Sequence, residues 1–197
     1  MSKKIFCLAM ALCVSVFFLM SCSFNKGPAE EAIKAAEQAV IATKAEAVKI
    51  VPDEVKALDD SLAAVKEKFV KKEYKEALAD AKALDTKAKA VLASAKVKKE
   101  ELTKKWTEIS AGLPKTLEDI QAQVDKLAKA KKLPKTLTKE KFEEAKAGLT
   151  SAKDEWAKAQ ASFTSGNLNE AVGMATSLKD KVLKIMESLG MSNPEVK

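Results

Sequence analysis

The sequence predicts an all-α fold, an elongated antiparallel helical bundle of about six helices in which two related helical-hairpin units are joined by a long central helix. Apolar residues recur at alternating steps of three and four positions along most of the chain, which is the spacing of one helix face. The five prolines fall at the ends of these apolar stripes, where helices are expected to begin or end. Two consecutive stripes also recur later in the chain.

Two helices are expected between residues 28 and 70. Pro28 suits the first turn of a helix that runs to about Ile50, and Thr43 fills the one gap in its apolar stripe. Pro52 breaks this helix because the residue before a proline is pushed out of the α region. The second helix has one apolar stripe facing a partner: Val55, Leu58, Leu62, Val65 and Phe69.

A long third helix is expected from Tyr74, and its apolar positions stay in phase almost to Pro114. Gly112 and Pro114 are expected to end it, the glycine through a left-handed cap and the proline through its missing N–H donor. Thr116 and Asp119 then resemble a capping box that begins a fourth helix, which stops before residue 134.

The fifth helix is expected over residues 142–163 and the sixth over residues 168–189, with Ser165-Gly166 turning the chain between them. They repeat helices two and three at a displacement of 94 residues, with turns of equal length. We interpret this as an internal duplication, the alternative being that amphipathic hairpins look alike. The twelve apolar pairs are Val55/Leu149, Leu58/Ala152, Leu62/Trp156, Val65/Ala159, Phe69/Phe163, Tyr74/Leu168, Leu78/Val172, Ala81/Ala175, Leu84/Leu178, Ala88/Val182, Val91/Ile185 and Ala95/Leu189.

The repeated segments Tyr74-Lys75-Glu76-Ala77 and Leu168-Asn169-Glu170-Ala171 resemble the second helix of tetratricopeptide-type hairpins. They are also similar to the alanine-rich helical domains of unknown function in bacterial envelope lipoproteins. The resemblance covers residues 29–95 and, more weakly, 115–189, and the 34-residue tetratricopeptide period is absent. It implies a scaffold or partner-binding role and supplies no catalytic residue.

The first residues are typical of a signal peptide. Lys3 and Lys4 precede an uncharged apolar run over residues 5–19, which is too short to span a bilayer comfortably. The alternative is a short transmembrane anchor. Residues 1–21 are therefore expected to be cleaved, and they are excluded from the fold prediction.

Leu19-Met20-Ser21-Cys22 follows this run and resembles the lipobox of bacterial lipoproteins. In that family the cysteine is acylated and becomes the mature N-terminus, so the resemblance implies lipidation of Cys22. Several acyl chains anchor a protein far more firmly than one. Lipoproteins kept at the inner membrane usually carry aspartate after the cysteine. Ser23 stands there, so the resemblance implies a lipid-anchored envelope protein at the outer membrane, facing the periplasm.

The predicted organisation follows from these boundaries. It comprises a signal peptide (1–21), a lipid anchor and tether (22–27), helical unit 1 (28–95), helical unit 2 (96–190) and a loose tail (191–197).

Composition excludes several functions. All 35 basic residues are lysine, against 28 acidic residues, and the chain contains neither arginine nor histidine. Specific nucleic-acid readout relies on arginine forks, so no nucleic-acid partner is expected. The resemblance implies that two cysteines leave with the signal peptide and that Cys22 carries lipid, so no disulfide, no histidine- or thiol-based catalysis and no ordinary zinc site is expected. Acidic pairs such as Asp59-Asp60 do not face one another on a helix. We therefore expect no enzyme, no metal and no cofactor.

Three constellations are candidates for binding. Seven lysines with Glu140 as the only acid surround the junction of helices four and five, where Lys129, Lys131, Lys132 and Lys135 could bind an anionic surface, or else cap a helix and keep the surface solvated. The seven are Lys126, Lys129, Lys131, Lys132, Lys135, Lys139 and Lys141.

The other two are the terminal Lys197 and the aromatic residues. One helical lipoprotein family joins its terminal lysine to peptidoglycan, although a lysine at this position by chance is unsurprising in so lysine-rich a chain. Trp106, Trp156, Phe163 and Tyr74 could line a groove, but each lies on an apolar stripe, which favours core packing.

The leading interpretation is therefore a membrane-anchored lipoprotein that serves as a structural or protein-interaction module of the cell envelope. Its partners would be the membrane, through the N-terminal lipid, and other envelope proteins or cell-wall components. Self-association through exposed heptad seams is a further expectation. The alternative is a periplasmic carrier for a hydrophobic or anionic ligand.

Overall fold

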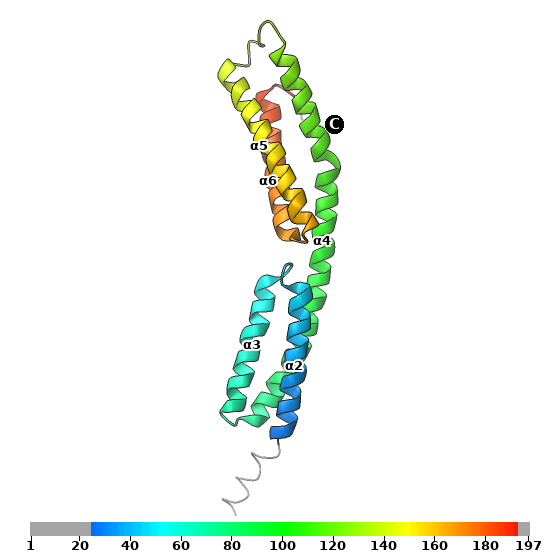
Figure 1. Ribbon diagram of the computed structural model, residues 1–197, viewed down its shortest axis with the longest axis vertical. Helices are drawn as coiled ribbons and strands as arrows, with labels where there is room; N and C mark the ends of the chain where they lie inside the picture. Colours follow the sequence, from blue (N-terminus) through cyan, green and yellow to red (C-terminus); the bar gives the residue numbers. More distant parts are fainter. Residues whose placement is uncertain (1–24, 193–197) are drawn as a thin grey trace, which may run out of the picture. The chain divides into compact units, whose positions relative to one another are not determined.

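The computed structural model describes residues 25–192, and most of them lie in five helices (Figure 1). The helices are α2 (Lys26–Ala47), α3 (Pro52–Val70), α4 (Tyr74–Ala128), α5 (Lys139–Thr164) and α6 (Leu168–Ser188), and the described residues contain no strand. The all-α class is thus confirmed. The predicted signal peptide, Cys22 and Lys197 lie outside the described residues.

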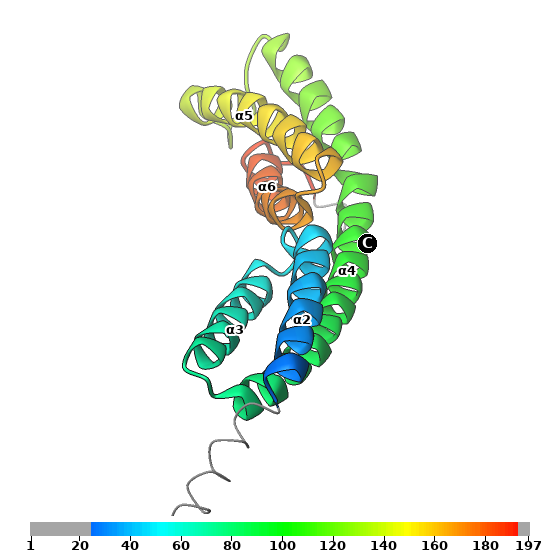
Figure 2. The same cartoon turned by 60° about the horizontal axis from the view of Figure 1, so that its bottom comes forward.

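The chain divides into two compact units between Val97 and Lys98, inside α4, whereas the sequence places the boundary between residues 95 and 96. The first unit contains α2, α3 and the first part of α4. The second contains the rest of α4, α5 and α6. Within their units α2 packs on α3 and α5 packs on α6, as both views show (Figures 1 and 2).

The first unit is built on the apolar stripes that the sequence predicts. Leu58 is fully buried and Val40 nearly so, and alanines such as Ala88 bring the helices close together. Thr43 is buried among them, and its hydroxyl donates a hydrogen bond to the Ala88 carbonyl at 3.3 Å. The polar side chain in the apolar stripe of α2 is therefore satisfied inside the core.

The expected end of the third helix at Gly112 and Pro114 is wrong. One helix, α4, continues through both residues to Ala128, so the third and fourth predicted helices are one. Gly112 is not among the glycines with positive φ, and the Thr116 hydroxyl donates to the Gly112 carbonyl at 3.1 Å instead of beginning a new helix.

Packing explains this continuity. Leu113, Leu117 and Ile120 are buried and continue the stripe of α4 on the far side of the proline. A proline inside a helix is less favourable than alanine by about 3 kcal/mol, whereas burying one large aliphatic side chain contributes about 1.5–3 kcal/mol. Burial of two or three such side chains therefore offsets the energetic cost of the proline. The sequence pattern alone does not reveal this burial.

The turns that precede α4 and α6 share one hydrogen-bond pattern. In each, three successive backbone N–H groups donate to carbonyls at the end of the preceding helix, which is the arrangement of a Schellman-type cap. The bonds are Lys71 to Glu67, Lys72 to Phe69 and Glu73 to Lys68 in the first turn, and Ser165 to Ala161, Gly166 to Phe163 and Asn167 to Ser162 in the second.

Candidate functional site

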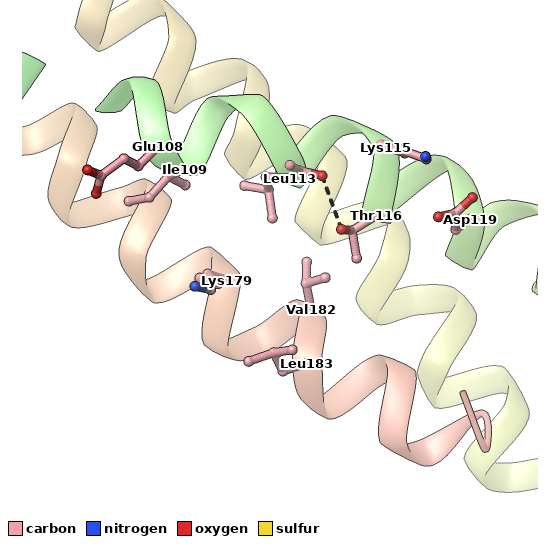
Figure 3. A pocket seen from close by; sticks show the side chains of 10 residues that line it. Glu108, Ile109, Leu113, Lys115, Thr116, Asp119, Lys179, Val182 and Leu183 are labelled. Carbon is pink, nitrogen blue, oxygen red and sulfur yellow. Dashed lines mark hydrogen bonds between the residues drawn. The ribbon is translucent and has the colours of Figure 1, made fainter. Parts of the chain in front are cut away.

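The second unit has a groove of about 600 Å³ between α4 and α6 (Figure 3). It lies beside the part of α4 where the sequence predicts a helix end. Its lining residues are Glu108, Ile109, Gly112, Leu113, Lys115, Thr116, Asp119, Lys179, Val182 and Leu183.

The floor of the groove is apolar. Leu113 and Thr116 of α4 face Val182 of α6 across it (Figure 3). Gly112 leaves the space open, because a Cβ at this position would have no neighbouring atom within 4 Å. The Thr116 hydroxyl is already bonded to the Gly112 carbonyl, so it adds little polarity to the floor.

The rim of the groove carries balanced charge. Glu108 and Asp119 supply two carboxylates, and Lys115 and Lys179 supply two ammonium groups. An apolar floor with a few polar groups at its edge is typical of sites for small apolar ligands. The sequence did not predict this groove, and its one local signal is Gly112, which lies one position before the buried Leu113 inside α4.

The structure places the candidate lysines on the segment that connects α4 to α5. Lys129, Lys131, Lys132 and Lys135 are all exposed, and in the part of the chain that the structure describes none of them lies within ion-pair distance of a carboxylate. Whether they bind an anionic surface stays a prediction. Among residues 25–192, no carboxylate lies close enough to neutralise their charges.

Glu140, the only acid in this stretch, is engaged at the start of α5. Its pKa lies below the ordinary value, because its carboxylate accepts hydrogen bonds from its own backbone N–H and then from the Thr138 side chain. Thr138 is also the N-cap of α5, and its hydroxyl accepts from the Lys141 N–H at 3.3 Å. This carboxylate is therefore committed to the helix start.

The large aromatic side chains are core residues. Trp106 of α4 stacks on Trp156 of α5 with ring centroids 5.2 Å apart, and on Phe163 with centroids 4.5 Å apart. Both tryptophans are less than a tenth exposed. Tyr74 meets Phe69 edge to face at 5.2 Å. The core-packing interpretation is confirmed for the two tryptophans, and no aromatic residue lines the groove.

The acidic pair Asp59-Asp60 is divided between two exposed ion pairs. Asp59 lies 2.6 Å from Lys44, and Asp60 lies 3.2 Å from Lys56. The two carboxylates therefore serve different partners, as expected for neighbours on a helix. Among residues 25–192 there is also no group of histidine, cysteine, aspartate and glutamate side chains placed to hold a metal ion.

An ion pair with a third partner joins α5 to α6. The Lys181 ammonium lies 2.6 Å from the Glu155 carboxylate, and the Ser151 hydroxyl donates to the same oxygen at 3.0 Å. The pKa of Glu155 is lowered, mainly by the hydrogen bond from Lys181. This contact belongs to the packing of the second unit.

No protein-family model matches the chain, and neither the curated proteins nor the solved structures contain a match to it. Within residues 25–192, none of the helices has the length and apolar character that crossing a bilayer requires. The functional proposal below therefore depends on the residues of this chain alone.

Proposed function

We propose that this protein is a bacterial lipoprotein, anchored at the outer membrane through acylated Cys22 and facing the periplasm. The observation that carries the proposal is Leu19-Met20-Ser21-Cys22, directly after a lysine-led apolar run of signal-peptide length. Ser23 after the cysteine favours the outer membrane over the inner one. Several acyl chains on one residue would make the anchoring effectively permanent.

The anchored part acts as a structural or protein-interaction module made of two related helical-hairpin units, in an elongated antiparallel arrangement. The duplication is supported by burial: among the twelve apolar pairs spaced by 94 residues, no member is exposed. It is also supported by the shared hydrogen-bond pattern of the two turns. Helical units of this kind present broad surfaces, which suits contact with other envelope proteins or cell-wall components.

Metabolic labelling with a fatty-acid probe tests the anchor. The native chain is expected to incorporate the label, and Cys22→Ala is expected to abolish it while Cys13→Ala leaves it unchanged after processing. An unlabelled native chain would refute the anchor. Crosslinking in intact cells followed by mass spectrometry tests the interaction role, and we expect envelope proteins among the products. Recovery of the anchored chain without any crosslinked protein or cell-wall fragment would refute that role.

The groove between α4 and α6 favours a second candidate function, that of a carrier for a hydrophobic or anionic ligand. Its apolar floor and its volume of about 600 Å³ would accommodate one acyl chain or a comparable small molecule. Native mass spectrometry of the purified chain would detect such a ligand. Gly112→Leu fills the groove and is expected to abolish binding. The matched control is Gly173→Leu, which adds the same side chain to α6 at an open position outside the groove. Equal ligand occupancy in both variants would exclude the groove as the site.

A further inference from the structure

We propose that the connection between α4 and α5 docks on the anionic phospholipid headgroups of a bilayer through Lys129, Lys131, Lys132 and Lys135. We call these four residues the lysine segment. This inference rests on the proposed lipid anchor and specifies a second membrane contact of the anchored protein.

The lysine segment differs from the helical lysines in its density, because no acidic residue lies between Asp125 and Glu140 in the sequence. Many exposed lysines of the helices are paired with a carboxylate one turn away, as Lys34 is with Glu30 and Lys56 is with Asp60. No member of the lysine segment has such a pair within the described residues. Its positive charge is therefore available to an external anionic group.

The two acidic residues that flank the segment make their hydrogen bonds elsewhere. Glu140, the nearest acid that follows, is engaged with Thr138 and with its own backbone at the start of α5. Asp125, the nearest acid that precedes, accepts a hydrogen bond from Gln121 at 2.8 Å. The C-terminus of α4 and the N-terminus of α5 border the segment with opposite partial charges, so its positive charge comes from the lysines themselves.

The chemistry of the segment fits a surface better than a defined phosphate site. Lysine is a hydrated point charge on a flexible stem, without the planar fork by which arginine grips one phosphate. None of the strongly exposed large apolar side chains of residues 25–192 lies in the second unit, because these are Ile41, Val48, Val70 and Val97. Contact through this segment would accordingly be electrostatic, at the level of the headgroups and without insertion.

Anionic headgroups are the occupant to which we commit, because the proposed anchor already holds the chain on a bilayer. Tethering turns a weak contact into an intramolecular one, at an effective concentration on the order of millimolar. Lysines near an anionic leaflet are attracted within about one Debye length, roughly 8 Å at physiological salt. The lysine segment could thus bind a membrane once the chain is anchored, even if its affinity for a membrane is weak without the anchor.

Lysine acetylation, followed residue by residue with mass spectrometry, tests the inference on the full lipidated chain. The chain is reconstituted in vesicles of phosphatidylcholine alone or mixed with phosphatidylglycerol. We expect acetylation of the lysine segment to be roughly fivefold slower in the anionic vesicles at low salt, and the protection to vanish at high salt. Lys146 and Lys181, which pair with Glu143 and Glu155 in the same unit, serve as internal controls.

Equal acetylation rates in the two kinds of vesicle would overturn the inference. So would protection by soluble polyphosphate but not by anionic vesicles, because the occupant would then be a free polyanion. A variant with all four lysines of the segment changed to glutamine is expected to lose any salt-dependent affinity for anionic vesicles. The control variant changes Lys34, Lys56, Lys71 and Lys89, which sit in ion pairs, and is expected to retain it.

A separate measurement tests the lipid anchor. Flotation of the chain with neutral vesicles reports the lipid, and failure to float refutes the proposed function. In that case the chain is added to preformed vesicles, and the same ratio of acetylation rates decides whether the lysine segment binds anionic lipid.

Discussion

Lys72 and Gly166, 94 residues apart, occupy equivalent positions in two turns and share a left-handed backbone, with φ of 64° and 79°. Each donates its N–H to the carbonyl of an aromatic residue three positions earlier, Phe69 or Phe163, at 3.0 Å. Among the described residues, Lys72 is the one non-glycine residue with a positive φ. A side chain with a Cβ is strained in this conformation, whereas glycine is not.

We therefore expect Lys72→Gly to raise the free energy of unfolding by about 1 kcal/mol, since it removes the Cβ clash and keeps the turn. The reciprocal change Gly166→Ala is expected to lower it by a similar amount, although the space around Gly166 is open. Urea denaturation followed by circular dichroism measures both. A loss of stability in Lys72→Gly would show that the flexibility of glycine in the unfolded chain outweighs the relieved strain.

Gly112→Ala distinguishes the observed helix from the one that the sequence predicts. Gly112 lies inside α4, and a Cβ there would meet nothing within 4 Å, so alanine is expected to stabilise the protein by up to about 1 kcal/mol. If the helix ended at Gly112 in a left-handed cap, the same change would destabilise it. Gly173→Ala, at an open position inside α6, is the matched control and is expected to stabilise similarly.

Trp106→Ala is expected to lower the free energy of unfolding by about 3–5 kcal/mol, because it opens a cavity beside Trp156 and Phe163. Thermal and urea denaturation by circular dichroism would measure this loss. Val97→Ala is the control, since Val97 is 58% exposed and its truncation is expected to change stability by less than about 0.5 kcal/mol. A small effect of Trp106→Ala would contradict the assignment of this ring to the core.

The contact between Glu155 and Lys181 is expected to make stability depend on pH. The folded protein lowers the pKa of Glu155, so the contact stabilises the fold above the unfolded pKa of about 4.3 and is lost as pH falls through the folded value. The native chain should exceed Glu155→Gln in stability at pH 7, by under about 1 kcal/mol because the pair is partly exposed, and the two should converge in acid. Glu144→Gln removes an exposed acid from the same helix and is expected to show a smaller pH-dependent difference. Identical pH profiles of the native chain and Glu155→Gln would refute the contact.

Local patterns were sufficient for most helix faces and for the turns. Residues of the predicted apolar stripes, such as Leu58 and Leu84, are buried as expected. Helices α3, α5 and α6 also end close to the predicted positions. Both outcomes depend on residues only three to five positions apart, which the sequence shows directly. The groove could not be predicted, because its floor is formed by Leu113 and Val182, which are far apart in the sequence.

The sequence by itself determined the all-α class and the clustering of Lys129 to Lys135 in one stretch, and it contains the Leu19-Met20-Ser21-Cys22 motif on which the proposed anchor rests. Only the tertiary structure decided that α4 passes through Pro114, that Trp106 stacks on Trp156, and that the lysine segment has no ion-pair partner within the described chain. The physical reason is that a backbone preference of a few kcal/mol at one residue competes with the burial of side chains whose partners lie elsewhere in the sequence.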